Sequence, residues 1–257
     1  MGGNMEHNLN TGDGLAKNFT ENQAIERLGK LFKSSPIPDD QILQNLPLFL
    51  HRRTLSRMLF INRIYEQILP IHGVVMEFGV RWGRNLALFE ALRGVHEPYN
   101  HTRRIIGFDT FEGFPSVHPK DGPSALATPG NYTVTDGYEH HLIELLRCHE
   151  QINPLPEITK CELVKGDAIL QSGDYFQKYP ETIVALAYFD MDIYAPTKAC
   201  LEAIRPHVTK GTILAFDELQ AREFPGETLA LKEVFGTDAF EIRRLPFSGA
   251  ASYVVIR

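Results

Sequence analysis

One stretch of sequence decides the fold: residues 74–94, VVMEFGVRWGRNLALFEALRG. Its first five residues are apolar apart from Glu77, as is typical of a buried strand, and a helix is predicted over 84–94. Gly79 and Gly83 lie between the two, where glycine lets the backbone turn sharply and approach a ligand closely. Glu77 ends the strand and is an acceptor suited to a cationic amino group. A strand, a glycine loop and a helix in this order are typical of sheets that bind a ligand at the carboxyl ends of their strands.

Outward from this stretch, short apolar strands alternate with amphipathic helices. The predicted strands are 73–79, 104–109, 160–165, 183–190, 211–217, 240–245 and 251–256. Further helices are predicted at 136–150, 197–207 and 227–236. This alternation predicts an α/β fold with a mostly parallel sheet covered on both faces. The segment 246–250 is too short for a helical crossover, so the last two strands should pair antiparallel.

Ahead of this domain, two segments differ in character. Residues 1–20 are rich in Gly and Asn and lack apolar periodicity, which predicts a mobile N-terminal arm. Residues 21–70 carry apolar side chains at helical spacing, for example Leu28, Leu31 and Phe32. We expect this segment to form a helical cap or an oligomerisation element, and residues 71–257 to form the main domain.

Composition limits the classes of function. The chain has 257 residues, of which 43% are hydrophobic and 23% are charged, as in an ordinary globular protein. A net charge of −6 without a long basic cluster argues against a nucleic-acid partner. Three cysteines without a CxxC spacing favour a reducing, cytoplasmic setting. No apolar run approaches the roughly 20 residues of a membrane span, so no membrane partner is expected.

The glycine loop favours one nucleoside cofactor over another. Dinucleotide-binding sites typically carry the motif GxGxxG, whereas Gly79 and Gly83 are spaced G-x-x-x-G. This spacing favours S-adenosylmethionine, which has no pyrophosphate to bind. Asp109 ends the second strand and could accept hydrogen bonds from both ribose hydroxyls, although a turn or cap carboxylate is the alternative. Asp167 ends the third strand, and either binds the adenine amino group or caps the next helix. The residues predicted to contact the cofactor are Glu77, Phe78, Gly79, Val80, Arg81, Gly83, Asn85, Asp109, Thr110, Phe111, Gly166, Asp167 and Asp190.

Two more predicted strands are each followed by acidic residues, which should lie at the carboxyl ends of the parallel strands, next to the glycine loop. Asp190 follows one apolar strand, and Asp217 and Glu218 follow the next. Three converging carboxylates repel one another unless a cation or protonation compensates, and Mg²⁺ prefers such oxygen ligands. We therefore predict a magnesium site formed by Asp190, Asp217 and Glu218, with Asp192 either a further ligand or a surface acid.

If S-adenosylmethionine donates its methyl group to a hydroxyl, the hydroxyl proton also needs an acceptor. Histidine suits proton transfer near neutral pH, and His140 and His141 lie where a helix is predicted to begin beside the same edge. Both are candidates, although a surface role for either is the alternative. Asp190 is the third predicted catalytic residue, through its place at the metal.

Four motifs together resemble the macrocin O-methyltransferase family, the deoxysugar methyltransferases of antibiotic pathways. They are EFGVRWGRN (77–85), GFDTFEGFP (107–115), FDMDIYAPT (189–197) and FDELQ with a following Gly-Glu-Thr helix start (216–228). The resemblance implies a Rossmann-like class I methyltransferase fold, in which an antiparallel hairpin ends a mostly parallel seven-stranded sheet. It also implies S-adenosylmethionine and Mg²⁺ as cofactors, and oligomers formed through the helical N-terminal part. Where this chain has Asp217-Glu218 the family commonly has two aspartates, and where it has Asp190-Met191-Asp192 the family often has Asp-Gly-Asp.

Together with these observations, the resemblance implies an S-adenosylmethionine-dependent, Mg²⁺-assisted O-methyltransferase. Its acceptor is expected to be a small sugar-containing molecule, methylated on a deoxyhexose hydroxyl in antibiotic biosynthesis, and the protein is expected to be a homo-oligomer. The alternatives are a catechol or phenolic O-methyltransferase, an NAD-dependent oxidoreductase that the missing GxGxxG disfavours, and a non-catalytic nucleoside-binding scaffold.

Overall fold

The structure, a computed structural model, describes residues 19–238 and 240–257. The predicted arm, 1–20, lies outside the described residues except for its last two positions, where α1 begins. The chain separates into two compact units, one ending at Leu59 and the other comprising Phe60–Arg257. The helices of the N-terminal part are α1 (Phe19–Lys33), α2 (Asp39–Ile42), the 3₁₀ helix η1 (Leu43–Phe49) and α3 (Arg52–Ile68).

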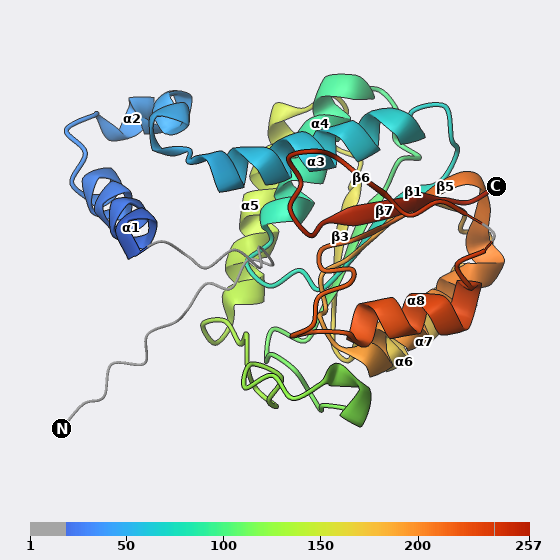
Figure 1. The fold of residues 1–257 in the computed structure, drawn as a ribbon. Helices are drawn as coiled ribbons and strands as arrows, with labels where there is room; N and C mark the ends of the chain where they lie inside the picture. Colours follow the sequence, from blue (N-terminus) through green and yellow to red (C-terminus); the bar gives the residue numbers. More distant parts are fainter. Residues whose placement is uncertain (1–18, 239) are drawn as a thin grey trace. The chain divides into compact units, whose positions relative to one another are not determined.

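A seven-stranded sheet forms the centre of the second unit (Figure 1). Its strands are β1 (Val74–Phe78), β2 (Ile105–Asp109), β3 (Cys161–Lys165), β4 (Val184–Phe189), β5 (Val208–Phe216), β6 (Arg243–Arg244) and β7 (Ser252–Val255). They lie in the order β3-β2-β1-β4-β5-β7-β6. The first five are parallel, and β7 pairs antiparallel with both β5 and β6. The predicted sheet, including its antiparallel end, is therefore confirmed.

Helices cover both faces of this sheet. They are α4 (Arg84–His96), α5 (Tyr138–Ile152), α6 (Ala168–Lys178), α7 (Tyr194–Ile204) and α8 (Gly226–Phe235), with short 3₁₀ turns η2 (Pro119–Asp121) and η3 (Arg205–His207). The end of α3 packs with α4 and α5 on one face, and α6, α7 and α8 pack on the other (Figure 1). Helix α6 was not predicted. Its sequence contains Gly173 and Asp174, which are poor helix formers, and its Tyr175 and Phe176 are buried in the core.

A row of phenylalanines fixes the register of the four central strands. Phe108, Phe78, Phe189 and Phe216 are paired across neighbouring strands. Their rings stack with centroid separations of 4.9, 5.1 and 5.0 Å along the row. All four are fully buried. The residue that follows each of them is Asp109, Gly79, Asp190 or Asp217, so the stack aligns four predicted site residues along one edge of the sheet.

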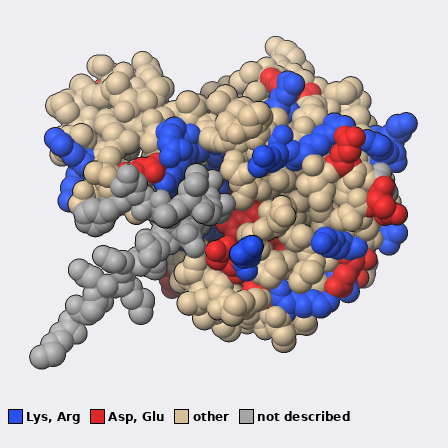
Figure 2. Space-filling model, in the orientation of Figure 1, with Lys and Arg blue, Asp and Glu red and all other residues tan. Residues whose placement is uncertain are grey.

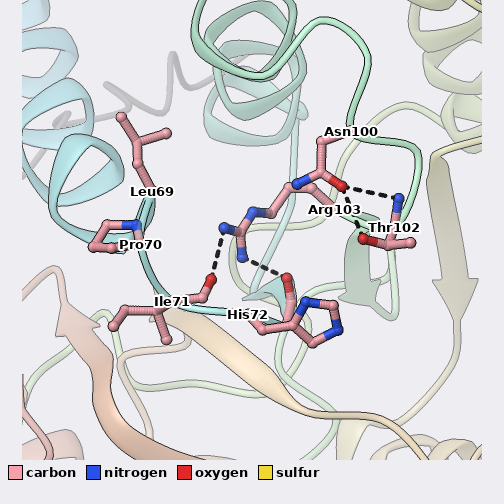
Figure 3. Close-up of a pocket in the computed structure, with 8 residues that line it drawn as sticks. Leu69, Pro70, Ile71, His72, Asn100, Thr102 and Arg103 are labelled. Atoms are coloured by element: carbon pink, nitrogen blue, oxygen red, sulfur yellow. Dashed lines mark hydrogen bonds between the residues drawn. The ribbon is translucent and has the colours of Figure 1, made fainter.

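The opposite, amino-terminal edge is held by one buried arginine. Arg103 donates hydrogen bonds to the carbonyl oxygens of Ile71 (2.8 Å) and Ile68 (3.0 Å), and pairs with Glu97 (2.9 Å). It therefore fastens the end of α3 to the start of β1. The small polar pocket beside it, shown in Figure 3, is lined by Leu69, Pro70, Ile71, His72, Gly73, Asn100, Thr102 and Arg103. This pocket lies at the wrong end of the strands for the predicted site.

Candidate active site

The end of β1 presents a buried carboxylate. Glu77 is fully buried, and its Oε1 accepts a hydrogen bond from Asn85 Nδ2 at 2.9 Å. Its Oε2 is buried without a hydrogen-bond partner among the described residues. Burial, followed by the charge of Asp190, raises the pKa of Glu77 well above its usual value. An acceptor left unsatisfied in this way suits a cationic ligand group, as predicted for the cofactor's amino group.

The loop after β1 needs glycine at both predicted positions. Gly79 has φ +92°, and a Cβ there would lie 2.1 Å from the carbonyl oxygen of Asp190. Gly83 has φ +77°, and its Cβ would lie 2.3 Å from Leu142 Cδ1. Gly79 therefore lets the ends of β1 and β4 approach each other, and Gly83 lets the loop approach α5.

Asp109 shapes the loops around the end of β2. Its Oδ2 accepts a hydrogen bond from the backbone N of Arg81 at 2.7 Å, and its Oδ1 accepts one from the backbone N of Phe111 at 2.6 Å. Both donors have positive φ, +50° and +61°. Asp109 thus has the turn role that the sequence left as an alternative. Each carboxylate oxygen retains a second lone pair, so binding of the ribose remains a prediction.

Asp167 likewise has a local role. Its Oδ1 accepts a hydrogen bond from the backbone N of Ile169 at 2.9 Å and caps α6. The adjacent Gly166, with φ +139°, donates its N–H to the carbonyl oxygen of Asp109 at 2.9 Å. The ends of β2 and β3 are thereby tied together, and the adenine contact of Asp167 remains a prediction.

The predicted metal ligands follow β4 and β5. Asp190 Oδ2 contacts Asn85 Nδ2 at 3.4 Å and Arg84 Nη2 at 3.5 Å. Asp217 Oδ1 accepts a hydrogen bond from the Tyr188 hydroxyl at 3.0 Å, and Glu218 is buried. No group of three or more His, Cys, Asp or Glu placed to hold a metal ion is found in 19–238 and 240–257. The chemistry of these donors still suits Mg²⁺, because all of them are carboxylate oxygens.

Asp192 belongs to the same group of acids. It has φ +62°, a conformation that few non-glycine residues adopt. Burial and the negative charges of Asp190, Glu218 and Asp217 raise its pKa well above the usual value. The sequence left Asp192 open between a ligand and a surface acid. The structure groups it with all three predicted ligands, and a role of Asp192 at the metal remains a prediction.

Glu227 was missed by the sequence analysis as a site residue. It lies in the first turn of α8 and is fully buried. Its Oε1 accepts hydrogen bonds from the backbone N of Met191 and of Asp192, both at 3.3 Å. Burial and the charges of Asp192 and Asp190 raise its pKa well above the usual value. The only sequence signal was its place in the Gly-Glu-Thr start of a predicted helix.

The two candidate histidines lie in α5, at the carboxyl edge of the sheet but apart from the group of acids. His140 and His141 are exposed on the first turn of α5. That turn lies against the loop after β1, because the Tyr138 hydroxyl donates a hydrogen bond to the carbonyl oxygen of Trp82 at 3.0 Å. The structure therefore places the first turn of α5, which carries both histidines, beside the loop after β1.

The long connection between β2 and α5, residues 110–137, forms a wall beside the acids. The guanidinium of Arg81 lies 4.8 Å from the centre of the Tyr132 ring. Phe114 from this connection packs with Ile193 and Phe224, which follow β4 and β5, in a small apolar cluster. Charges of both signs are interspersed on the face drawn in Figure 2, which also shows a compact group of acidic side chains near its middle. The site therefore combines an acidic edge with an apolar wall.

Comparisons with known proteins place this arrangement in a family. No family model and no curated protein matches the chain. Among solved structures, CalS11, a calicheamicin methyltransferase, is 46% identical over 94% of both chains, with a TM-score of 0.91. An apo structure of CalS11, described as a TDP-rhamnose 3'-O-methyltransferase of calicheamicin biosynthesis, is 43% identical over 94% of this chain and 96% of the other, with a TM-score of 0.83. This chain belongs to the same O-methyltransferase family.

Membership confirms the class I methyltransferase fold and the S-adenosylmethionine-dependent chemistry predicted from the motifs. The O-methyltransferase NovP is 17% identical over 79% of this chain and 80% of its own, with a TM-score of 0.59, and shares the fold. The family sets aside the NAD-dependent oxidoreductase and the non-catalytic scaffold. No described helix of the methyltransferase is long and apolar enough to cross a membrane.

Proposed function

We propose that this methyltransferase transfers a methyl group from S-adenosylmethionine to a hydroxyl of a nucleotide-linked deoxyhexose in antibiotic biosynthesis. The observation that carries the proposal is the identity of 43% over 94% of the chain with CalS11, which is described as acting on TDP-rhamnose. The group of acids beside an apolar wall supports it. A deoxyhexose offers both neighbouring hydroxyls and a methyl group, and so matches both parts of the site.

The residues at the ends of β1, β2 and β3 would hold the cofactor. Glu77 would accept hydrogen bonds from the amino group, since its Oε2 is otherwise unsatisfied. Asp109 would accept hydrogen bonds from the ribose hydroxyls, and Asp167 from the adenine amino group. S-adenosylmethionine supplies the electrophilic methyl group on its sulfonium. The left-handed Arg81 and the glycines at 79 and 83 would let the backbone approach it closely.

Asp190, Asp217 and Glu218 would hold Mg²⁺ beside the acceptor. When bound, the ion supplies Lewis acidity, which lowers the pKa of a hydroxyl and orients neighbouring hydroxyls. The protein's part is to keep three carboxylates on adjacent strand ends and to orient Asp217 through the Tyr188 hydroxyl. The clustering of these acids with Asp192 supports the assignment, because such a group is costly without a cation.

Two sets of residues are candidates for accepting the hydroxyl proton. His140 and His141 are exposed on the first turn of α5 and suit proton transfer near neutral pH. Asp192 is favoured by its place among the acids. If a histidine is the base, its Ala variant should lose kcat while cofactor affinity stays near wild type. Full activity in both single variants and the double variant would leave Asp192 or solvent in this role.

The N-terminal helices are proposed to join copies of this chain into a homo-oligomer. Several of their large apolar side chains are exposed, among them Leu43 (75%), Leu48 (64%) and Leu31 (54%). Exposed apolar surface on this scale is typical of an interface. The free cysteines Cys148, Cys161 and Cys200 are compatible with a reducing compartment such as the cytoplasm.

An acceptor panel tests the proposal. The protein is incubated with S-adenosylmethionine labelled in its methyl group and with TDP-rhamnose, free rhamnose, a rhamnosylated aglycone or catechol, and the labelled product is identified by mass spectrometry. We expect the nucleotide sugar to be methylated fastest. Faster methylation of the rhamnosylated aglycone would move the reaction after glycosyl transfer, and exclusive methylation of catechol would refute a sugar acceptor.

A further inference from the structure

The acids after β4 are carried on a strained turn. The backbone N of Ile193 donates a hydrogen bond to the carbonyl oxygen of Met191 at 2.6 Å, which closes a γ-turn around Asp192. With φ +62°, Asp192 is the central residue of the rare, left-handed form of this turn. Such a conformation persists only when its surroundings hold it. The direction in which Asp190 and Asp192 point therefore depends on what fixes this turn.

Two buried carboxylates hold this turn. Glu227 accepts hydrogen bonds from the backbone N of Met191 and of Asp192, as described above. Asp121 Oδ1 accepts a hydrogen bond from the backbone N of Tyr194 at 2.5 Å. Asp121 is fully buried and lies in η2, far away in the sequence. Every backbone N–H from residue 191 to residue 194 is thereby satisfied by a carboxylate or by the turn itself.

Asp121 also links this turn to the connection between β2 and α5, in which Asp121 itself lies. Its Oδ2 accepts a hydrogen bond from the backbone N of His118 at 2.7 Å. Helix α7 begins at Tyr194, and its N-cap residue, Ile193, makes no capping side-chain hydrogen bond. Asp121 takes over this capping from another segment of the chain.

The start of α8 is packed against the same carboxylate. A Cβ at Gly226 would lie 2.7 Å from Asp121 Oδ1 and 2.5 Å from the backbone N of Tyr194. Any larger residue there would separate Asp121 from the turn. Gly226 also precedes Glu227, so both carboxylates that hold the turn meet at this point.

We propose that Asp121 is a positioning residue for methyl transfer, which holds the 190–194 turn so that Asp190 and Asp192 face the acceptor. The inference rests on the proposed function for its catalytic consequence. Asp121 itself touches neither acceptor nor cofactor in this account. It acts through the backbone of Tyr194, and its loss would let the turn relax without removing any acid from the site.

The chain offers a matched control. Glu150 is also a buried carboxylate that accepts two backbone hydrogen bonds, from Lys160 N at 2.5 Å and Cys161 N at 2.6 Å. Glu150 lies in α5, and its two partners lie at the start of β3, on the opposite edge of the sheet from the acids. Asp121→Ala and Glu150→Ala therefore remove the same kind of interaction, and only the first lies beside the proposed site.

Hydrogen exchange of residues 190–197 and steady-state kinetics with TDP-rhamnose are measured for both variants and for Asp121→Asn. We expect exchange in this segment to be at least about tenfold faster in Asp121→Ala and unchanged in Glu150→Ala. We expect kcat to fall about 10- to 100-fold in Asp121→Ala, with the KM for S-adenosylmethionine near wild type. Asp121→Asn keeps an oxygen for Tyr194 N and should recover most of kcat.

Unchanged exchange of 190–197 in Asp121→Ala would overturn the proposal, as would equal losses of kcat in Asp121→Ala and Glu150→Ala. If Asp121→Ala does not fold, Gly226→Ala decides, since a Cβ at this position separates Asp121 from Tyr194 N and must speed exchange in 190–197 by more than Glu150→Gln does. A wild-type protein that methylates no sugar would contradict the proposed function. The exchange comparison would still decide whether Asp121 holds the turn.

Discussion

The two edges of the sheet use buried acids in opposite ways. Near the amino-terminal edge, the nearly buried Glu97 pairs with Arg103 at 2.9 Å. In α4, which covers the sheet, the buried Glu90 pairs with Arg93 at 2.9 Å. At the carboxyl edge, Asp192 and Glu227 have other acids as their strongest charged neighbours. The first arrangement gives stability, because each charge is compensated where it is buried.

The second arrangement costs stability, since clustered carboxylates repel one another and are desolvated. Folding alone gives no reason to bring Asp190, Asp192, Asp217 and Glu218 together, whereas binding a cation and a hydroxylated acceptor does. From this difference we infer that the acids at the amino-terminal edge hold the fold and that those at the carboxyl edge carry the chemistry. Substitutions on the two sides should separate in the same way.

The largest effect is expected from removing one charge at the carboxyl edge. Asp217→Asn keeps an oxygen for the Tyr188 hydroxyl and should lower kcat about a hundredfold or more, because a Lewis acid contributes several kcal/mol to such a reaction. Asp190→Asn should do the same. The melting temperature should stay level or rise, since repulsion is relieved. Unchanged kcat in Asp217→Asn, measured with saturating substrates, would remove this residue from the site.

At the amino-terminal edge the pattern should reverse. Glu97→Gln leaves the buried charge of Arg103 without its partner and should lower the free energy of unfolding by about 3–5 kcal/mol. The kcat, measured well below the melting temperature, should stay near wild type. Denaturant titration and kinetics on the same sample check both. A loss of kcat as large as in Asp217→Asn would break the distinction between the edges.

The Glu97–Arg103 pair should also make the free energy of unfolding depend on pH. Burial raises the pKa of Glu97, but hydrogen bonds and charge from Arg103 outweigh it, and the net pKa is lower than usual. The stability from this pair is therefore present above the unfolded pKa and is lost as the pH falls through the folded pKa. Unfolding followed from neutral to acidic pH should show less acid-dependent loss in Glu97→Gln than in wild type. Parallel curves for the two proteins would contradict the assignment.

A smaller effect is expected on cofactor affinity when Asp109 is replaced. Asp109→Ala removes a carboxylate predicted to bind the ribose and should weaken binding of S-adenosylhomocysteine by about 1–3 kcal/mol. Glu144→Ala is the control, because Glu144 pairs with Arg147 on the exposed surface of α5. Isothermal titration measures the affinity of both variants for S-adenosylhomocysteine. Equal affinities would contradict the assignment of Asp109 to the ribose.

The smallest effect is expected for Glu218→Asp. This change keeps the carboxylate, shortens it by one methylene group and restores the pair of aspartates usual in the resembling family. Activity should stay close to wild type, whereas Glu218→Gln, which removes the charge, should lose much more. Similar rates for these two variants would take Glu218 out of the metal site.

The sequence predicted the sheet and its ligand edge because both depend on local patterns. Each central strand has a Phe at or next to its end, and the residue after this Phe is Gly79, Asp109, Asp190 or Asp217, so the alignment of these positions follows from strand register. The roles of Asp121 and Glu227 could not be predicted. Their partners are backbone N–H groups 73 and 36 residues away, and no spacing in the sequence marks such a contact.

The left-handed turn at Asp192 was hidden for the same reason. Its conformation is imposed by those distant carboxylates rather than by the preference of the residues in it. Helix α6 was missed because packing of Tyr175 and Phe176, rather than helix propensity, holds it. Local patterns thus predicted which acids lie together at this edge, and long-range contacts hold the turn that carries two of them.

Metal dependence of methyl transfer tests the central claim most directly. Transfer of labelled methyl from S-adenosylmethionine to TDP-rhamnose is measured after exhaustive treatment with EDTA and again after Mg²⁺ is restored, with cofactor binding followed in the same samples. We predict that turnover is lost on chelation and returns with Mg²⁺, while S-adenosylhomocysteine binds throughout. Full turnover after exhaustive chelation would contradict the account, because the acids at the carboxyl edge would then have no cation to hold.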